Sequence, residues 1–162
     1  MALKADRIHN ASHIDFFMNE EAERGGIVVQ STVGSGAAMD QSLQLATYAA
    51  SPSGYVPLGV LMNDMVDLDL TRQHENFHKD EVQKGGKVTI WNKCTVLTNM
   101  IETGQTPAAN TRAFIGHSGY LSAAKIVDDD GDGGSTGNQT HVVGQWLSSK
   151  DEDGYAKVRI DL

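Results

Sequence analysis

The C-terminal half of the chain, residues 86–162, is made of short runs in which apolar and polar side chains alternate, separated by glycine turns. The run KVTIW alternates with a period of two, and so does AKVRID, where Ala156, Val158 and Ile160 lie between charged or polar residues. This period is typical of antiparallel strands that bury one face. The sequence therefore predicts a mainly β fold.

Length and charge narrow the class of protein further. A chain of 162 residues with 40% hydrophobic residues is long enough for one domain with a real core. Seventeen glycines against three prolines predict many tight turns. The net charge of −8, with basic residues scattered singly, argues against binding to a nucleic-acid backbone or an anionic membrane surface.

The single cysteine and the N-terminal residues bear on the compartment. Cys94 has no partner for an intramolecular disulfide, and its place in WNKCTV indicates an inert, small apolar residue. No stretch approaches the ~20 apolar residues of a membrane-spanning helix. Charges and histidines occupy the N-terminus where a signal peptide needs an apolar core, so we expect synthesis in a cytoplasm.

The N-terminal segment is expected to be an arm followed by a short helix. Residues 1–11 have few apolar side chains, and Ser12 with Asp15 resembles a capping box. Ile14, Phe17 and Met18 would share one helical face, and Gly25 and Gly26 would end the helix. The predicted organisation is an arm and helix over 1–24 and one β-rich domain over 25–162. The apolar stripe could dock onto the chain's own core or onto a neighbouring subunit.

Further strands are expected at GIVVQSTV, at QSLQLATYA and over 51–70, where Pro52 and Pro57 indicate an edge strand or an irregular crossing. Residues 71–85 are the most polar stretch and are predicted to be an exposed connection. Trp91 and Trp146 lie in strand patterns, where packing in a core or interface is favoured over ligand stacking.

Two motifs suggest metal chemistry. His74, Glu75 and His78 match H-E-x-x-H, which on a helix places two imidazoles toward a zinc ion and uses the glutamate as general base. The charged flanks, the nearby glycine pair and the distance to Glu102, the best-spaced third ligand, weigh against a zinc hydrolase. This hydrolase is kept as an alternative hypothesis.

The second motif is a calcium-type loop in an acidic run. Asp128, Asp130 and Asp132 fall at positions 1, 3 and 5, with Gly133 at position 6, but Gln139 stands where a bidentate glutamate is required. A solvated surface loop is the preferred interpretation, and weak calcium binding is the alternative. The sequence contains no phosphate-binding loop of the G-x-x-x-x-G-K-[ST] type and no G-x-S-x-G nucleophile elbow.

Three segments carry a family resemblance: IDFFMNEEAERGGIVV, VDLDLTRQHENFHKDEVQKGGKVTIW and VGQWLSSKDEDGYAKVRIDL. Their order and their glycine-turn-strand phrases resemble the capsid decoration (cement) proteins of tailed bacteriophages. The resemblance spans most of the chain. A head-fibre base or tail-associated β-module is the closest alternative, although no fibre-forming repeat is present.

The resemblance implies a β-barrel or β-tulip fold and a homotrimer on the outer surface of the expanded phage head. There the protein would bind the major capsid protein at threefold and quasi-threefold positions and stabilise the shell. It implies no catalytic residues, and under this hypothesis we expect no cofactor and no metal. The charge argument above separately disfavours nucleic-acid and membrane partners. Burial of apolar groups from an arm that becomes ordered on docking would favour attachment, and the candidate interface residues are Ile14, Phe16, Phe17 and Met18.

Overall fold

The computed structural model describes residues 12–31, 44–67, 81–126 and 140–162, apart from the side chains of 12–15. Nearly all of its regular structure is strand, with one short 3₁₀ turn, η2 (His117–Gly119). The strands are β1 (Ser12–Met18), β2 (Ile27–Gln30), β3 (Leu45–Thr47), β4 (Pro57–Leu61), β5 (Asp64–Val66), β6 (Glu81–Gln83), β7 (Lys87–Thr98), β8 (Arg112–Ile115), β9 (Leu121–Ser122), β10 (Val142–Trp146) and β11 (Ala156–Asp161).

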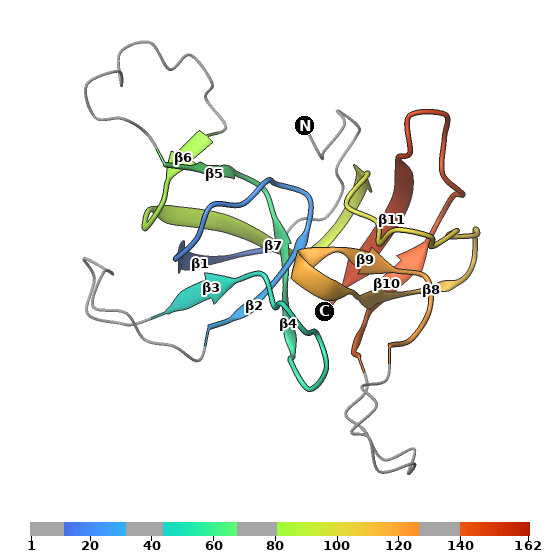
Figure 1. Cartoon of the computed structure of the whole chain (residues 1–162), viewed down its shortest axis with the longest axis horizontal. Helices are drawn as coiled ribbons and strands as arrows, with labels where there is room; N and C mark the ends of the chain where they lie inside the picture. Colours follow the sequence, from blue (N-terminus) through green and yellow to red (C-terminus); the bar gives the residue numbers. More distant parts are fainter. Residues whose placement is uncertain (1–11, 32–43, 68–80, 127–139) are drawn as a thin grey trace.

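Five strands close into a barrel in the order β1-β3-β2-β4-β7, and β7 pairs back onto β1 (Figure 1). All of these pairings are antiparallel except β1–β3, which is parallel. Closure leaves no free edge in the ring. The predicted mainly β, barrel-type fold is confirmed.

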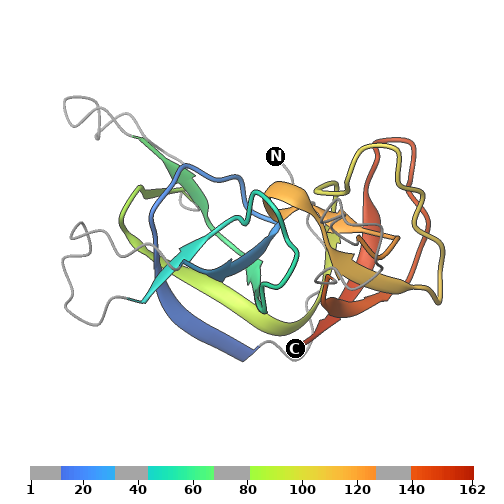
Figure 2. The same cartoon turned by 60° about the horizontal axis from the view of Figure 1, so that its bottom comes forward.

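The twelve-residue strand β7 extends beyond the barrel and begins a second sheet. Its last residues pair with β11, and the order continues β11-β10-β8-β9 (Figure 2). We call β8 to β11 together with the second half of β7 the C-terminal sheet. Alternation along both halves of β7 gives each sheet one buried face. One continuous strand therefore belongs to both parts of the molecule.

Two clusters of buried side chains follow from this arrangement. The barrel core contains residues from all five barrel strands: Met18, Val28, Ala46, Leu61, Val88 and Ile90, together with Met65 of β5. The second core lies between the barrel and the C-terminal sheet, where Ile27 and Val29 of β2 meet Trp146 and the inward side chains of β7, β10 and β11. Strand β2 thus has both faces buried, which explains its unbroken apolar run IVV.

The helix expected over 12–24 is wrong, because its first half is strand β1. The apolar residues Ile14, Phe17 and Met18 fit a helical face, but Ile14, Phe16 and Met18 fit a strand equally well. Six residues of β1 pair with β7, and these long-range hydrogen bonds decide between the two patterns. The N-terminal segment from Ser12 onward is part of the barrel rather than an appendage.

Other local predictions also need correction. The segment that begins at Pro57 is β4, an internal barrel strand between β2 and β7, so the edge-strand alternative is wrong. The β2–β4 register shifts between Val28 and Val29, which agrees with the irregular alternative. Pro57 is tolerated because it is the first residue of β4. At Gly59 a Cβ would lie 2.5 Å from the carbonyl oxygen of Trp91, so a glycine there lets β4 approach β7 closely. Residues 81–83, expected in an exposed connection, form strand β6, which pairs in parallel with β5.

Candidate functional site

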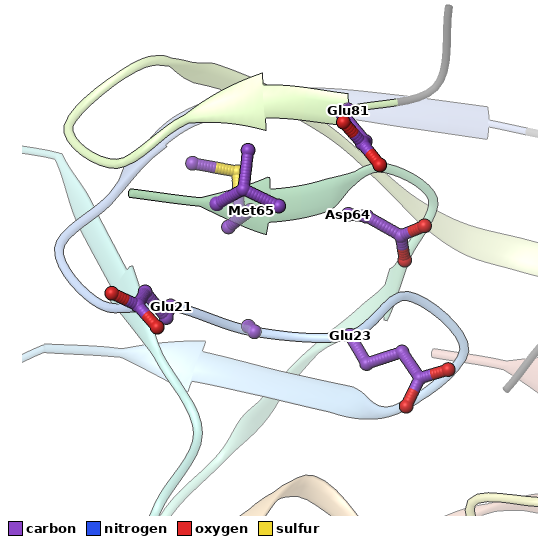
Figure 3. Close-up of a pocket in the computed structure, with 7 residues that line it drawn as sticks. Glu21, Glu23, Asp64, Met65 and Glu81 are labelled. Carbon is purple, nitrogen blue, oxygen red and sulfur yellow. The ribbon is translucent and has the colours of Figure 1, made fainter. Parts of the chain in front are cut away.

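An acidic pocket lies beside the two-stranded sheet β5–β6. It has a volume of about 380 Å³ and is lined by four carboxylates, from Glu21, Glu23, Asp64 and Glu81. Its apolar lining comes from Ala22, Met65 and Val66. Figure 3 shows Asp64 and Glu81 on neighbouring strands toward one end of the pocket, with Glu21 toward the other.

Backbone pairing fixes this cluster of carboxylates. Asp64 and Glu81 are direct cross-strand partners in the β5–β6 ladder, so two like charges stand side by side. The carboxylate of Asp64 accepts a hydrogen bond from the backbone N–H of Arg24 at 2.8 Å, and the Arg24 guanidinium lies 3.9 Å from its second oxygen. The pocket as a whole is suited to a positively charged group that reaches over an apolar floor.

A second pocket, of about 330 Å³, contains the pair Glu102 and His117. Nδ1 of His117 lies 2.5 Å from Oε1 of Glu102, whereas Oε2 of Glu102 is buried without a hydrogen-bond partner in the described part of the chain. Ser118, next in sequence, has a left-handed backbone conformation with φ of 50°. The pair joins the segment after β7 to the turn before β9.

Tyr48 connects that same turn to the barrel. Its hydroxyl donates to the carbonyl oxygen of Glu23 at 2.5 Å, and its ring packs against Gly119, where any Cβ would collide with it. The backbone N–H of Ser118 donates to the carbonyl oxygen of Ala49 at 2.7 Å. Burial raises the pKa of Tyr48 well above its usual range, so the phenol stays neutral.

A third pocket, of about 420 Å³, opens beside Tyr48 and Tyr55. At this pocket Oε1 of Glu20 accepts hydrogen bonds from the Thr47 hydroxyl and from the backbone N–H of Tyr48, each at 2.5 Å. These bonds fix the carboxylate against strand β3. No local motif predicts this pocket, because its residues come from segments that are separate in the sequence.

The outward face of the C-terminal sheet has the opposite charge to the acidic pocket. Arg112, Gln145, Arg159 and Thr95 are successive cross-strand partners on β8, β10, β11 and β7, and therefore form one row. Lys157 pairs with Leu97 in the next outward row on one side, and Lys93 pairs with Asp161 on the other. We call this surface the basic face.

The residues predicted from metal motifs have different outcomes. His74, Glu75 and His78, as well as Asp128, Asp130 and Asp132, lie outside the described residues. Glu102, considered as a third zinc ligand, forms a hydrogen bond with His117. Within the described ranges, no group of three or more His, Cys, Asp or Glu side chains could hold a metal ion.

The candidate interface residues all lie on β1. Met18 is fully buried in the barrel core, Phe16 is partly buried against the same core, and Phe17 is half-buried. Of Ile14 only the backbone is described, paired with Ile90. Their contact with a partner stays a prediction, but at least Met18 already has a role inside the chain's own barrel.

Cysteine and tryptophan residues occupy core positions, as predicted. Cys94 is 2% exposed, and burial raises the pKa of its thiol to about 11. Trp146 is fully buried in the second core, and Trp91 packs partly buried against it. These side chains stabilise the fold rather than line a site.

No family model matches the sequence, and no curated protein matches it significantly. In the described part of the chain no helix is long and apolar enough to cross a membrane. The features of this chain that bear on its function are therefore the surfaces of the fold and the resemblance of its sequence segments.

Proposed function

We propose that this protein is a structural component of a virion, a decoration (cement) protein that binds the major capsid protein on the outer surface of an expanded phage head. In this proposal it acts as a homotrimer at threefold and quasi-threefold positions and carries out no catalysis. The protein would be made in the host cytoplasm and end on the virion surface.

The observation that carries the proposal is how the resembling segments fit together in the fold. IDFFM of the first segment forms β1, KVTIW of the second forms the barrel half of β7, and AKVRID of the third forms β11. These three strands are neighbours in the order β1–β7–β11. The phrases that carry the resemblance therefore build one continuous framework, as expected for a protein whose task is mechanical.

The fold also supports a role in stabilising the shell mechanically. A closed barrel has no edge to slip, and β7 joins it covalently to a second sheet with a shared core. In this proposal the joined barrel and sheet act as one unit between neighbouring capsid proteins. Many identical sites on a shell would add avidity to each individual contact.

The test is binding to shells from the virus whose genome encodes the chain. Purified protein should co-sediment with expanded heads that have been stripped of accessory proteins, at a fixed ratio to the major capsid protein, and should raise the temperature at which the heads open. Electron cryo-microscopy should place it on the outer surface. Failure to bind expanded heads, with binding to tails instead, would support the tail-associated alternative.

Native mass spectrometry on protein purified without chelator tests the remaining alternative. We expect a metal-free homotrimer. A monomer carrying one zinc ion, lost in His78→Ala together with a hydrolytic activity, would overturn the proposal in favour of the hydrolase.

A further inference from the structure

The basic face stands out in a chain whose net charge is −8. Four cations point outward from its strands and only one carboxylate does; they are Lys93, Arg112, Lys157 and Arg159, and Asp161. Asp161 is already paired with Lys93 at 3.1 Å. Arg112 and Arg159 are exposed and make no ion pair with any residue that the structure describes.

The register of the sheet sets the spacing of the two arginines along it. Arg112 and Arg159 flank Gln145 in one cross-strand row, and the amide of Gln145 donates to the side-chain oxygen of Asn110 at 2.7 Å. Two guanidinium groups in one cross-strand row can each donate a pair of parallel N–H bonds to a carboxylate. The face is therefore suited to an acidic protein surface.

The acidic pocket at β5–β6 is such a surface. Its carboxylates surround an apolar lining made by Ala22, Val66 and the edge of the largely buried Met65. An arginine or lysine can lay its aliphatic stem on such a floor and bring its charge to the carboxylates. Arg24 already lies 3.9 Å from Asp64, and a second cation beside Glu81 would further offset the repulsion between the paired carboxylates.

The two surfaces cannot meet within one molecule. The strands β5 and β6 lie at one end of the long axis, and β8, β10 and β11 lie at the other end (Figures 1 and 2). A second copy of the chain can supply the complement to each surface. Contact between two different surfaces is heterologous, and it closes into a ring when the rotation between copies allows it.

We propose that copies of this chain associate head to tail, with the acidic β5–β6 pocket of one copy on the basic face of the next. The inference rests on the self-association proposed above and assigns the two surfaces that mediate it. Association should weaken as ionic strength rises, because the contact is between exposed charges.

Charge reversal tests the assignment by sedimentation velocity at low and high ionic strength. Arg112→Glu with Arg159→Glu reverses the face, and Glu21→Arg with Glu81→Arg reverses the pocket. Each double variant should weaken association at low salt by about tenfold or more. The variant with all four substitutions restores opposite signs and should associate within a few-fold of the wild type.

Lys125→Glu with Lys150→Glu is the matched control, because it changes net charge as much as the face variant but lies outside the basic face. This control should associate as the wild type does. Loss of association equal to that of the face variant would overturn the assignment, since net charge alone would then explain it.

Two other outcomes would also overturn the proposed head-to-tail contact, and they can be told apart from each other. Association unaffected by either double variant would reject these surfaces while leaving the proposed oligomer intact. A wild type that stays monomeric at every concentration and at low salt would reject self-association itself, whereas capsid binding is measured separately. Circular dichroism on every variant shows whether each is folded before association is compared.

Discussion

The barrel and the C-terminal sheet solve the problem of free edges in different ways. The barrel closes on itself, although apart from β7 its strands are only three to seven residues long. The C-terminal sheet stays open, and its outer strand β9 is covered by the segment around Ile101, which bridges to Leu121. Short strands thus suffice where closure supplies the pairing, whereas the open sheet needs an added segment at its edge.

The two parts differ equally in how they are packed. The barrel core is made of medium-sized aliphatic residues from each strand, but the second core is built around one large side chain, Trp146. The second core also takes Ile27 and Val29 from the barrel's own strand β2. The C-terminal sheet therefore depends on the barrel surface, and we expect the two parts to unfold together.

Truncation of Trp146 should have the largest effect on the coupling between the two parts. Trp146→Ala should lower the free energy of unfolding by about 3–5 kcal/mol, because it removes the largest fully buried side chain. Met18→Ala in the barrel core should cost about 2–5 kcal/mol. Urea unfolding followed by circular dichroism and by tryptophan fluorescence should give one coincident transition in both variants.

Separate transitions for the two probes would contradict the expected coupling. In that case the barrel would be a unit that folds without the C-terminal sheet. Trp91 remains as the fluorescent reporter in the Trp146→Ala variant, and it packs against the second core.

Several strands of both the barrel and the C-terminal sheet can be predicted from the sequence. The alternation in KVTIW and AKVRID predicts β7 and β11 correctly, and the continuous run IVV fits a strand buried on both faces. Periodicity reports only whether one face is buried, so it identifies such strands without naming their partners. It could not show that β7 is shared by two sheets.

The errors have physical causes. In β1 a helical and a strand pattern coexist, and pairing with the distant β7 selects the strand. Strand β6 has only three residues and lies between charged residues, so it is too short to show an alternating pattern. The acidic pocket combines residues from segments 40 or more positions apart, such as Glu21 and Asp64, so no local motif could reveal it.

Tyr48 lies where the two parts meet: its hydroxyl bonds within the barrel, and its ring packs against Gly119 of the turn before β9. Tyr48→Phe separates these two contributions. The change removes the hydroxyl that donates to the Glu23 carbonyl and leaves that carbonyl without this donor. We expect a loss of about 1–2 kcal/mol in the free energy of unfolding. Tyr120→Phe, at an exposed position, is the control and should change it by less than about 0.5 kcal/mol.

An effect of Tyr48→Phe no larger than that of its control would mean that the hydroxyl adds little to stability and that Tyr48 acts through the packing of its ring against Gly119. Hydrogen exchange at Ser118, whose N–H donates to Ala49, reports directly on whether the turn has opened.

Alkaline pH should weaken the second core through Cys94. The folded thiol has a pKa of about 11, raised from a usual value of 9.0 by burial. Above about pH 9 the unfolded state therefore binds fewer protons than the folded state, and the free energy of unfolding falls until about pH 11. Denaturant titrations across this range should show the decline.

Cys94→Ala removes the thiol and should flatten the decline between about pH 9 and pH 11. Tyr48 contributes a decline of the same sign from about pH 10, since its pKa is also raised, and this part should survive in the variant. Identical pH profiles for the variant and the wild type would show that Cys94 is not the responsible group.

The smallest effect is expected from an ion pair on the basic face, compared with one beside the acidic pocket. Lys93 and Asp161 lie 3.1 Å apart but are 59% and 50% exposed, so Lys93→Ala should cost less than about 0.5 kcal/mol. Asp64 also accepts the Arg24 backbone N–H, so Asp64→Ala should cost about 1 kcal/mol.

Chemical denaturation of both variants at low and high salt makes the comparison. Only the Lys93 effect should vanish at high salt, because water and ions screen exposed charges but do not replace a backbone hydrogen bond. Equal costs and equal salt dependence would show that the two parts of the molecule hold their charges in the same way.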